Sequence, residues 1–162
     1  MPGPKKSPRN VTGNSPDKLS IVVYAGFFDK VHYALVMASA SAAMGRPVTL
    51  FFTMGACQAL RATGADSAEG WRQMPLSEIK KGGTKAETAG QLDEEFANRN
   101  VATFEELLEA CVMLGVKFMV CEMGLIAVGM KDEPLRDDIT IEEGGVTTFL
   151  DDASKDGTII FI

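Results

Sequence analysis

Residues 19–53 read LSIVVYAGFFDKVHYALVMASASAAMGRPVTLFFT, and the order of apolar runs in this stretch indicates the fold class. Residues 19–25 are a β-branched apolar run, which predicts a strand buried on both faces. We expect a helix to follow, with Asp29 as its N-cap and Gly45 just past its end. Residues 47–53 are apolar again and predict a second strand. One face of the helix between them is apolar, at Val31, Leu35, Ala38 and Ala42. A strand, a helix and a strand in succession form a βαβ unit, which implies parallel strands and a right-handed crossover.

The same alternation returns after residue 100. Thr103 and Glu106 form a capping box, which predicts a helix that starts there and closes at Gly115. Residues 115–121, GVKFMVC, predict a short buried strand that delivers Cys121 to its carboxyl end. Residues 122–130 then predict a short apolar helix interrupted by glycines.

The last third of the chain completes the pattern. We expect a short strand at 139–141, a helix within 146–153, and a terminal strand at 158–162 that must be covered to avoid an adhesive edge. Together these elements predict an α/β fold, a three-layer α/β/α sandwich with a mainly parallel sheet of about five strands. Residues 19–162 are expected to form one domain, and residues 1–18, rich in Pro, Gly, Lys and Arg, a disordered tail.

The middle of the chain, residues 54–100, has weaker periodicity. Helical turns are expected at 57–61 and 91–99, on either side of the polar, glycine-bearing stretch 80–85. Such a segment after a strand end is either a functional lid or disordered. Trp71 could close over the strand ends if the segment is a lid, or could pack as an apolar satellite.

Composition excludes several classes of protein. The 162 residues carry a net charge of −6, which argues against a nucleic-acid surface. No apolar stretch reaches the roughly 18 residues that a membrane span needs. Three irregularly spaced cysteines are too few for a disulfide framework or a zinc ribbon, and with nine methionines they indicate a reducing cytoplasm. The N-terminal residues lack the apolar region of a secretory signal.

Motifs for common cofactors are also missing from the sequence. It contains no G-x-G-x-x-G after the first strand, no G-x-x-x-x-G-K-[ST], no G-x-S-x-G and no C-x-x-C. One histidine and scattered carboxylates give no metal set. We therefore expect no cofactor and no metal.

Candidate residues gather where the parallel strands are expected to end. Cys121 would lie beside helix N–H groups that favour a thiolate, although Glu122 opposes a second negative charge; alternatively it is a small buried hydrophobe. Cys57 follows the second strand and could form a redox or resolving pair with Cys121, or have no role. His32, in a first helical turn, could relay a proton or be incidental. Cys111 lies on an apolar helix face and is assigned to core packing.

With these residues in view, the chain resembles the DsrE/DsrF-like family, in the branch labelled peroxiredoxin-like, over 19–162. The resemblance rests on the order and spacing of several pieces. They are the first strand with its Ala-rich helix, VTLFFTMG at 48–55, LLEAC at 107–111 leading to GVK at 115–117, CEMG at 121–124, and GVTTFL at 145–150. The peroxidase label is not carried over, because no Pro-x-x-x-Thr-x-x-Cys setting surrounds any cysteine.

The resemblance implies a parallel sheet flanked by helices, assembly into oligomers, and intracellular sulfur trafficking. A cysteine at the end of the third strand carries sulfur in this family as a persulfide or thiosulfonate, and Cys121 occupies that position. The implied partners are sulfur-donor and sulfur-acceptor proteins. The branch often has a serine soon after this cysteine, where this sequence has Gly124, so a possible hydrogen-bond donor to the thiolate is missing.

Our first hypothesis is therefore a cytoplasmic, homo-oligomeric, sulfurtransferase-like sulfur carrier that uses Cys121. The alternative is a non-catalytic oligomeric binding or scaffold protein with a small-ligand site at the strand ends. A thiol redox sensor that uses Cys57 and Cys121 is the third possibility.

Overall fold

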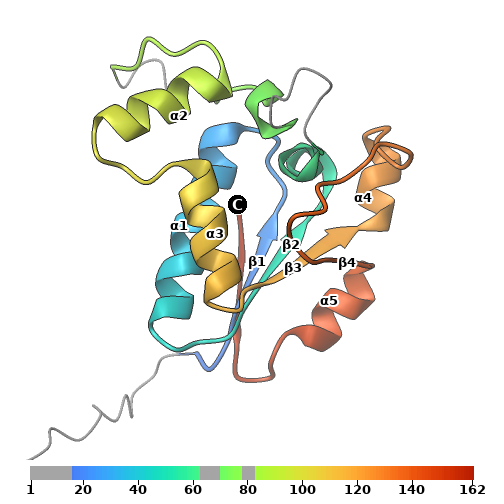
Figure 1. The fold of residues 1–162 in the computed structure, drawn as a ribbon. Helices are drawn as coiled ribbons and strands as arrows, with labels where there is room; N and C mark the ends of the chain where they lie inside the picture. Colours follow the sequence, from blue (N-terminus) through green and yellow to red (C-terminus); the bar gives the residue numbers. More distant parts are fainter. Residues whose placement is uncertain (1–15, 63–69, 78–82) are drawn as a thin grey trace, which may run out of the picture.

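The computed structural model describes residues 16–62, 70–77 and 83–162. Its centre is a five-stranded sheet in the order β4-β3-β2-β1-β5, and every neighbouring pair is parallel (Figure 1). The predicted parallel α/β architecture is confirmed. The strands are β1 (Leu19–Val23), β2 (Val48–Phe52), β3 (Lys117–Cys121), β4 (Ile141–Gly144) and β5 (Thr158–Phe161).

Helices of unequal size cover the two faces of the sheet. One face packs under the long helices α1 (Phe28–Ala43) and α3 (Phe104–Met113), and the other carries the short helix α5 (Val146–Asp152) (Figure 1). The remaining elements are α2 (Ala89–Asn98), α4 (Glu122–Ala127) and the 3-10 helices η1 (Met54–Leu60) and η2 (Gly70–Gln73). In this described part of the chain, no helix is long and apolar enough to cross a membrane.

Alternation along the strands divides the core into a large and a small part. On β2, Leu50 and Phe52 face the large core under α1 and α3, whereas Phe51 faces α5. All five residues of β2 are buried, so its sequence pattern does not tell which face of the sheet carries the larger helices. Only one residue of α5, Phe149, is buried.

The start of α1 differs from our prediction. Asp29 is not the N-cap, because the helix already begins at Phe28 and Phe27 precedes it without a capping side chain. Asp29 lies in the first turn, where its carboxylate accepts hydrogen bonds from the backbone N–H and the hydroxyl of Ser77. The predicted end is confirmed: α1 stops at Ala43, and Gly45 follows with a φ of 83°.

The described part of the middle segment packs into the large core. Trp71 is buried and stacks on Phe28 and Phe104, at centroid distances of 5.2 and 4.7 Å. Its indole N–H donates to Glu105 at 2.7 Å. Trp71 is therefore part of the large core and is neither a lid over the strand ends nor a separate apolar satellite. Most of the glycine-bearing stretch 80–85 lies outside the described residues.

The C-terminal strand is less covered than we predicted. β5 pairs with β1 at the edge of the sheet, and its outward side chains remain open, with Ile159 47% and Phe161 67% exposed. The expectation that this strand is covered is wrong for the isolated chain. Near the start of the described chain, Lys18 forms an ion pair with Asp152. Residues 1–15 lie outside the described residues, so the disordered tail stays a prediction.

Candidate functional site

Cys121 is the last residue of β3 and stands directly before α4. Its side chain faces the α5 side of the sheet, where it belongs to a small buried cluster with Phe51, Met119 and Phe149. The residue is only 1% exposed. Cys121 thus lies at the carboxyl end of a parallel strand, where α/β proteins place their chemistry, but under a cover of aromatic side chains.

Glycines allow the backbone segments around Cys121 to approach closely. A Cβ atom added to Gly26, after β1, would lie 2.9 Å from the Cα of Gly55, after β2. Met54 precedes Gly55 in a left-handed conformation, with a φ of 51°, which is uncommon for a residue with a side chain. The ends of β1 and β2 are therefore joined by backbone contact, without room for intervening side chains.

Gly124 has a packing role that the sequence did not reveal. A Cβ atom there would lie 2.5 Å from Oγ1 of Thr53 and 2.7 Å from the backbone nitrogen of Met54. The serine that the resembling branch often carries near this place does not fit at 124 in this arrangement. Glycine here lets α4 pack directly against the chain that leaves β2.

Cys57 lies on η1, which packs against α4, but it belongs to the large core and is fully buried. Burial, and after it the neighbouring Cys121, raise the pKa of the Cys57 thiol to about 12. Because the thiolate is the reactive form, Cys57 is a poor nucleophile at neutral pH. All three cysteines are free thiols.

His32 lies on the other side of the sheet from Cys121. It is buried among α1, Phe96 of α2 and the α2–α3 connection, and its Nε2–H donates to the carbonyl of Ala102 at 2.8 Å. Burial lowers the pKa of His32, against the hydrogen bond to Ala102 and the charges of Asp93 and Asp29. His32 is thus buried in the helical layer, away from Cys121.

The two phenylalanines after β1 and the third cysteine separate between the surface and the core. Phe27 is partly exposed at the strand ends, whereas its neighbour Phe28 points into the large core. Cys111 is buried on α3, as predicted, and its thiol contacts the carbonyl oxygen of Leu35 at 3.7 Å. Among the residues in the described ranges, no group of three or more His, Cys, Asp or Glu side chains is placed to hold a metal ion.

Helix α5 covers Cys121 and is attached at two points. Phe149 stacks on Phe51, with ring centroids 4.6 Å apart and an interplanar angle of 13°. At the end of the helix, Asp152 accepts from Lys18 Nζ (2.6 Å), Lys117 Nζ (2.7 Å) and Thr49 Oγ1 (2.6 Å). Burial opposes ionisation of this carboxylate, but these hydrogen bonds hold the pKa of Asp152 well below its usual value. The ion-paired end is one attachment, and Phe149, the buried residue of α5, is the other.

An apolar cavity of about 380 Å³ lies beside this cover, and part of its wall is at the strand ends, where our alternative hypothesis expected a small-ligand site. Phe51 and Phe149 line it, and they also belong to the cluster that buries Cys121. Its other walls come from β1, β5 and the strand ends, through Val22, Phe161 and Met123. In the sequence, this cavity corresponds to alternate apolar residues of β1, β2 and β5. These side chains line an open cavity because α5 is too small to cover them all.

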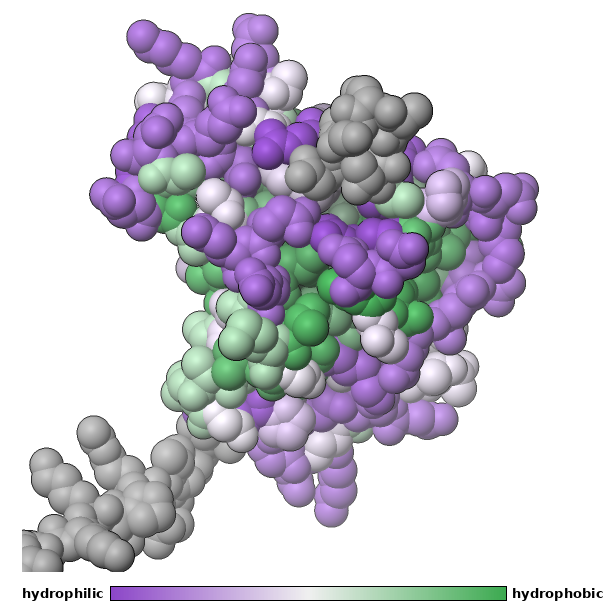
Figure 2. Space-filling view, viewed as in Figure 1, coloured by the Kyte–Doolittle hydropathy of each residue, from purple (hydrophilic) through white to green (hydrophobic). Residues whose placement is uncertain are grey.

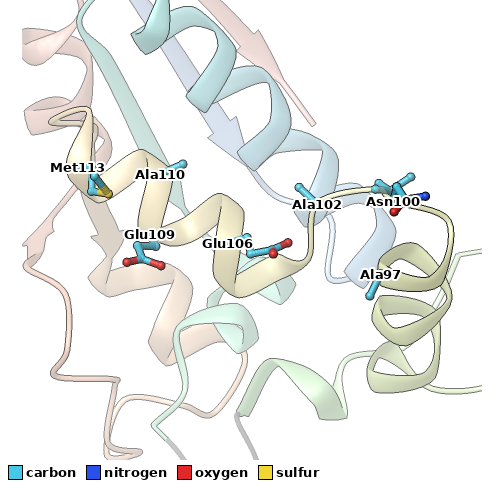
Figure 3. Close-up of a pocket in the computed structure, with 8 residues that line it drawn as sticks. Ala97, Asn100, Ala102, Glu106, Glu109, Ala110 and Met113 are labelled. Carbon is cyan, nitrogen blue, oxygen red and sulfur yellow. The ribbon is translucent and has the colours of Figure 1, made fainter.

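A second cavity, of about 660 Å³, lies on the opposite helical layer. Figure 3 shows the end of α2, the connection at Asn100 and Ala102, and Glu106, Glu109 and Met113 along α3. The carboxylate of Glu106 accepts a hydrogen bond from the backbone N–H of Thr103 in the capping box, which confirms the predicted helix start. Over α2 the surface is mainly hydrophilic, and hydrophobic residues appear further down the same face (Figure 2). This cavity has no part in the surroundings of Cys121.

Comparison with known proteins places the chain in a family. The family model described as "DsrE/DsrF/DrsH-like family" matches residues 15–161. The uncharacterized protein YrkE of Bacillus subtilis is 30% identical over 156 residues, which cover 90% of this chain and 96% of YrkE. The sulfur carrier protein DsrE2 of Allochromatium vinosum is 25% identical over 158 residues, which cover 90% of this chain and 98% of DsrE2.

A solved structure agrees with the fold. The ychN protein from E. coli superposes with a TM-score of 0.51 over 90% of this chain and 99% of that chain, at 14% identity. At that identity the likeness concerns the fold alone. The family match, which spans nearly the whole chain, shows that the protein belongs to the DsrE/DsrF/DrsH-like family.

Proposed function

We propose that this protein is a sulfur carrier, which holds sulfane sulfur on Cys121 as a persulfide or thiosulfonate and passes it to a partner thiol. Its family and its relative DsrE2, named as a sulfur carrier protein, support a role in sulfur relay in general. The observation that carries the specific proposal is the position of Cys121 at the carboxyl end of β3, beside an apolar cavity. Cys57 and Cys111 both belong to the large core, and burial raises the pKa of each thiol to about 12.

The transfer step is a thiol exchange without net oxidation. The Cys121 thiolate attacks the outer sulfur of a donor persulfide, R–S–SH, and a new bond forms between Sγ and that sulfur. The S–S bond of the donor breaks, and its electron pair leaves with the thiolate R–S⁻, which takes a proton from water. Delivery is the same reaction with an acceptor thiolate attacking the outer sulfur on Cys121.

Access to Cys121 requires its cover to move, because the residue is 1% exposed. Helix α5 is suited to such movement, since it has seven residues and only Phe149 is buried. We propose that donor and acceptor proteins reach the thiol by displacing Phe149. Homo-oligomer formation is part of this proposal, because several large apolar side chains of the described residues are exposed. A cytoplasmic location fits the free thiols.

The test is the intact mass of the protein after incubation with a persulfide donor. Wild type should gain one or more sulfur atoms in a form that reductant removes, and Cys121→Ser should not. Cys57→Ser and Cys111→Ser are the matched controls, and each should keep the gain. A sulfur adduct that persists in Cys121→Ser would overturn the assignment.

The burial of Cys121 also favours a second candidate function, a non-catalytic binding protein. In that case the apolar cavity would hold a small ligand and Cys121 would only fill space beneath it. Native mass spectrometry of the purified protein separates the two functions. An organic ligand retained equally by wild type and Cys121→Ser, with no sulfur adduct on either, would favour the binding protein.

A further inference from the structure

The cavity beside Cys121 has no charge of its own. Its walls are aliphatic, aromatic and methionine side chains, with hydroxyls only from Thr53 and Tyr24. An anion that entered it would lose water and would find no cation in exchange. An uncharged apolar group would instead gain from contact with these walls.

The carboxylates beside the carboxyl ends of β3 and β4 also disfavour anions. Glu122, the residue after Cys121, and Glu143 on β4 both pair with Lys131, at 2.8 and 2.9 Å. Two carboxylates share one ammonium group, so the local balance is negative. The ammonium group of Lys131 is already engaged and offers little to a thiosulfate or a charged thiol.

The cavity and the thiol share their walls. Phe51 and Phe149 line the cavity and also bury Cys121. Met123, which lines the cavity too, stands two residues after Cys121 in the first turn of α4. A group seated in the cavity therefore contacts the same aromatic pair that covers Cys121 and that must move for any sulfur transfer.

We propose that the cavity receives the organic part of a sulfur donor, and that persulfides of small uncharged apolar thiols are substrates of Cys121. This rests on the proposed function and names a substrate class for the same site. With R an alkyl or aryl group in the cavity, the Cys121 thiolate attacks the terminal sulfur of R–S–SH. The donor S–S bond breaks, R–S⁻ leaves and takes a proton from water, and Cys121 keeps the transferred sulfur.

The first experiment compares two donors generated in situ, benzyl persulfide and glutathione persulfide, by the rate of sulfur gain in intact mass. The ratio of rates is divided by the same ratio on a short cysteine peptide, which removes their intrinsic reactivity. We expect a preference for benzyl persulfide of about tenfold or more from burial of the ring. Leu150→Lys, at the cavity wall, should reduce that preference several-fold, and Met113→Lys, an exposed site on α3, should not.

A second experiment measures occupation of the cavity without sulfur chemistry. Benzyl alcohol is titrated into Cys121→Ser, and methyl NMR shifts of Val22, Val146, Leu150 and Ile159 are followed; saturable shifts confined to these methyls are expected. No shifts, or shifts that follow protein concentration because a second copy fills the cavity, would overturn the inference. Sulfur transfer without donor preference would overturn the substrate class alone. Binding of benzyl alcohol without transfer from either donor would overturn the proposed function, and this substrate with it.

Discussion

Removing the ring of Phe149 should expose Cys121 without unfolding the protein. Phe149 is the single buried residue of α5, and its stack on Phe51 closes the cluster around the thiol. A buried Phe→Ala change costs about 3–5 kcal/mol, and we take the lower end, about 3 kcal/mol, because this side of the sheet is half open. Since about 1.4 kcal/mol is a factor of ten, the open population of α5 should rise about a hundredfold.

The assay is the rate of alkylation of each cysteine, resolved by mass spectrometry, at increasing low urea. In Phe149→Ala, Cys121 should be labelled about a hundredfold faster than in wild type, with little dependence on urea because a short helix exposes little surface. Cys111 lies in the large core and reports global unfolding. Phe149→Leu, which keeps an apolar side chain, should produce a much smaller acceleration of Cys121.

The reasoning would be refuted if Cys121 and Cys111 were labelled at the same rate with the same urea dependence. That result would mean that Cys121 is reached only through global unfolding. A local movement of α5 could then not deliver sulfur to it, and the sulfur-carrier proposal would lose its route of access.

Three further changes test the surroundings of this cover. Gly124→Ser should lower the free energy of unfolding by about 2 kcal/mol in urea titrations, because its Cβ meets backbone, whereas Gly145→Ser, where a Cβ meets nothing within 4 Å, should be nearly neutral. Asp152→Asn should lower the free energy of unfolding by about 2 kcal/mol at neutral pH. Because the pKa of Asp152 is lowered, the difference from wild type should shrink as the pH falls below about 3.9. A difference that stays the same in acid would contradict the role of Asp152 in holding α5. The pKa of His32 is lowered by burial, so its stabilising contribution is complete above about pH 6.5 and is lost as the pH falls below it. Wild type should therefore lose stability as the pH falls below about 6.5, and His32→Gln should flatten that profile in the same titrations.

The parallel sheet could be predicted because its signals are local. The apolar runs of β1 and β2, and the capping box at Thr103, depend on residues a few positions apart. The helix ends at Gly45 and Gly115 are also marked locally, because glycine readily adopts the positive φ values, of 83° and 75°, that occur there.

The arrangement around Cys121 depends on contacts between distant segments and could not be predicted in the same way. The reason for glycine at 124 lies in Thr53 and Met54, about 70 positions earlier in the chain. Burial of His32 depends on where Phe96 and Ala102 pack. The apolar cavity arises because α5 leaves part of its face of the sheet open. The sequence predicted a helix within 146–153, but it did not predict how much of the sheet that helix covers.

The strand order also has a consequence for synthesis of the protein on the ribosome. β1 lies between β2 and β5, so one of its neighbours is made soon after it and the other is the last of the five strands. Until Thr158–Phe161 emerge, one edge of β1 keeps its backbone N–H and C=O groups unpaired beside apolar residues such as Ile21. A nascent chain therefore carries an adhesive strand edge for most of its synthesis, and its yield in cells should depend on chaperones that shield that edge.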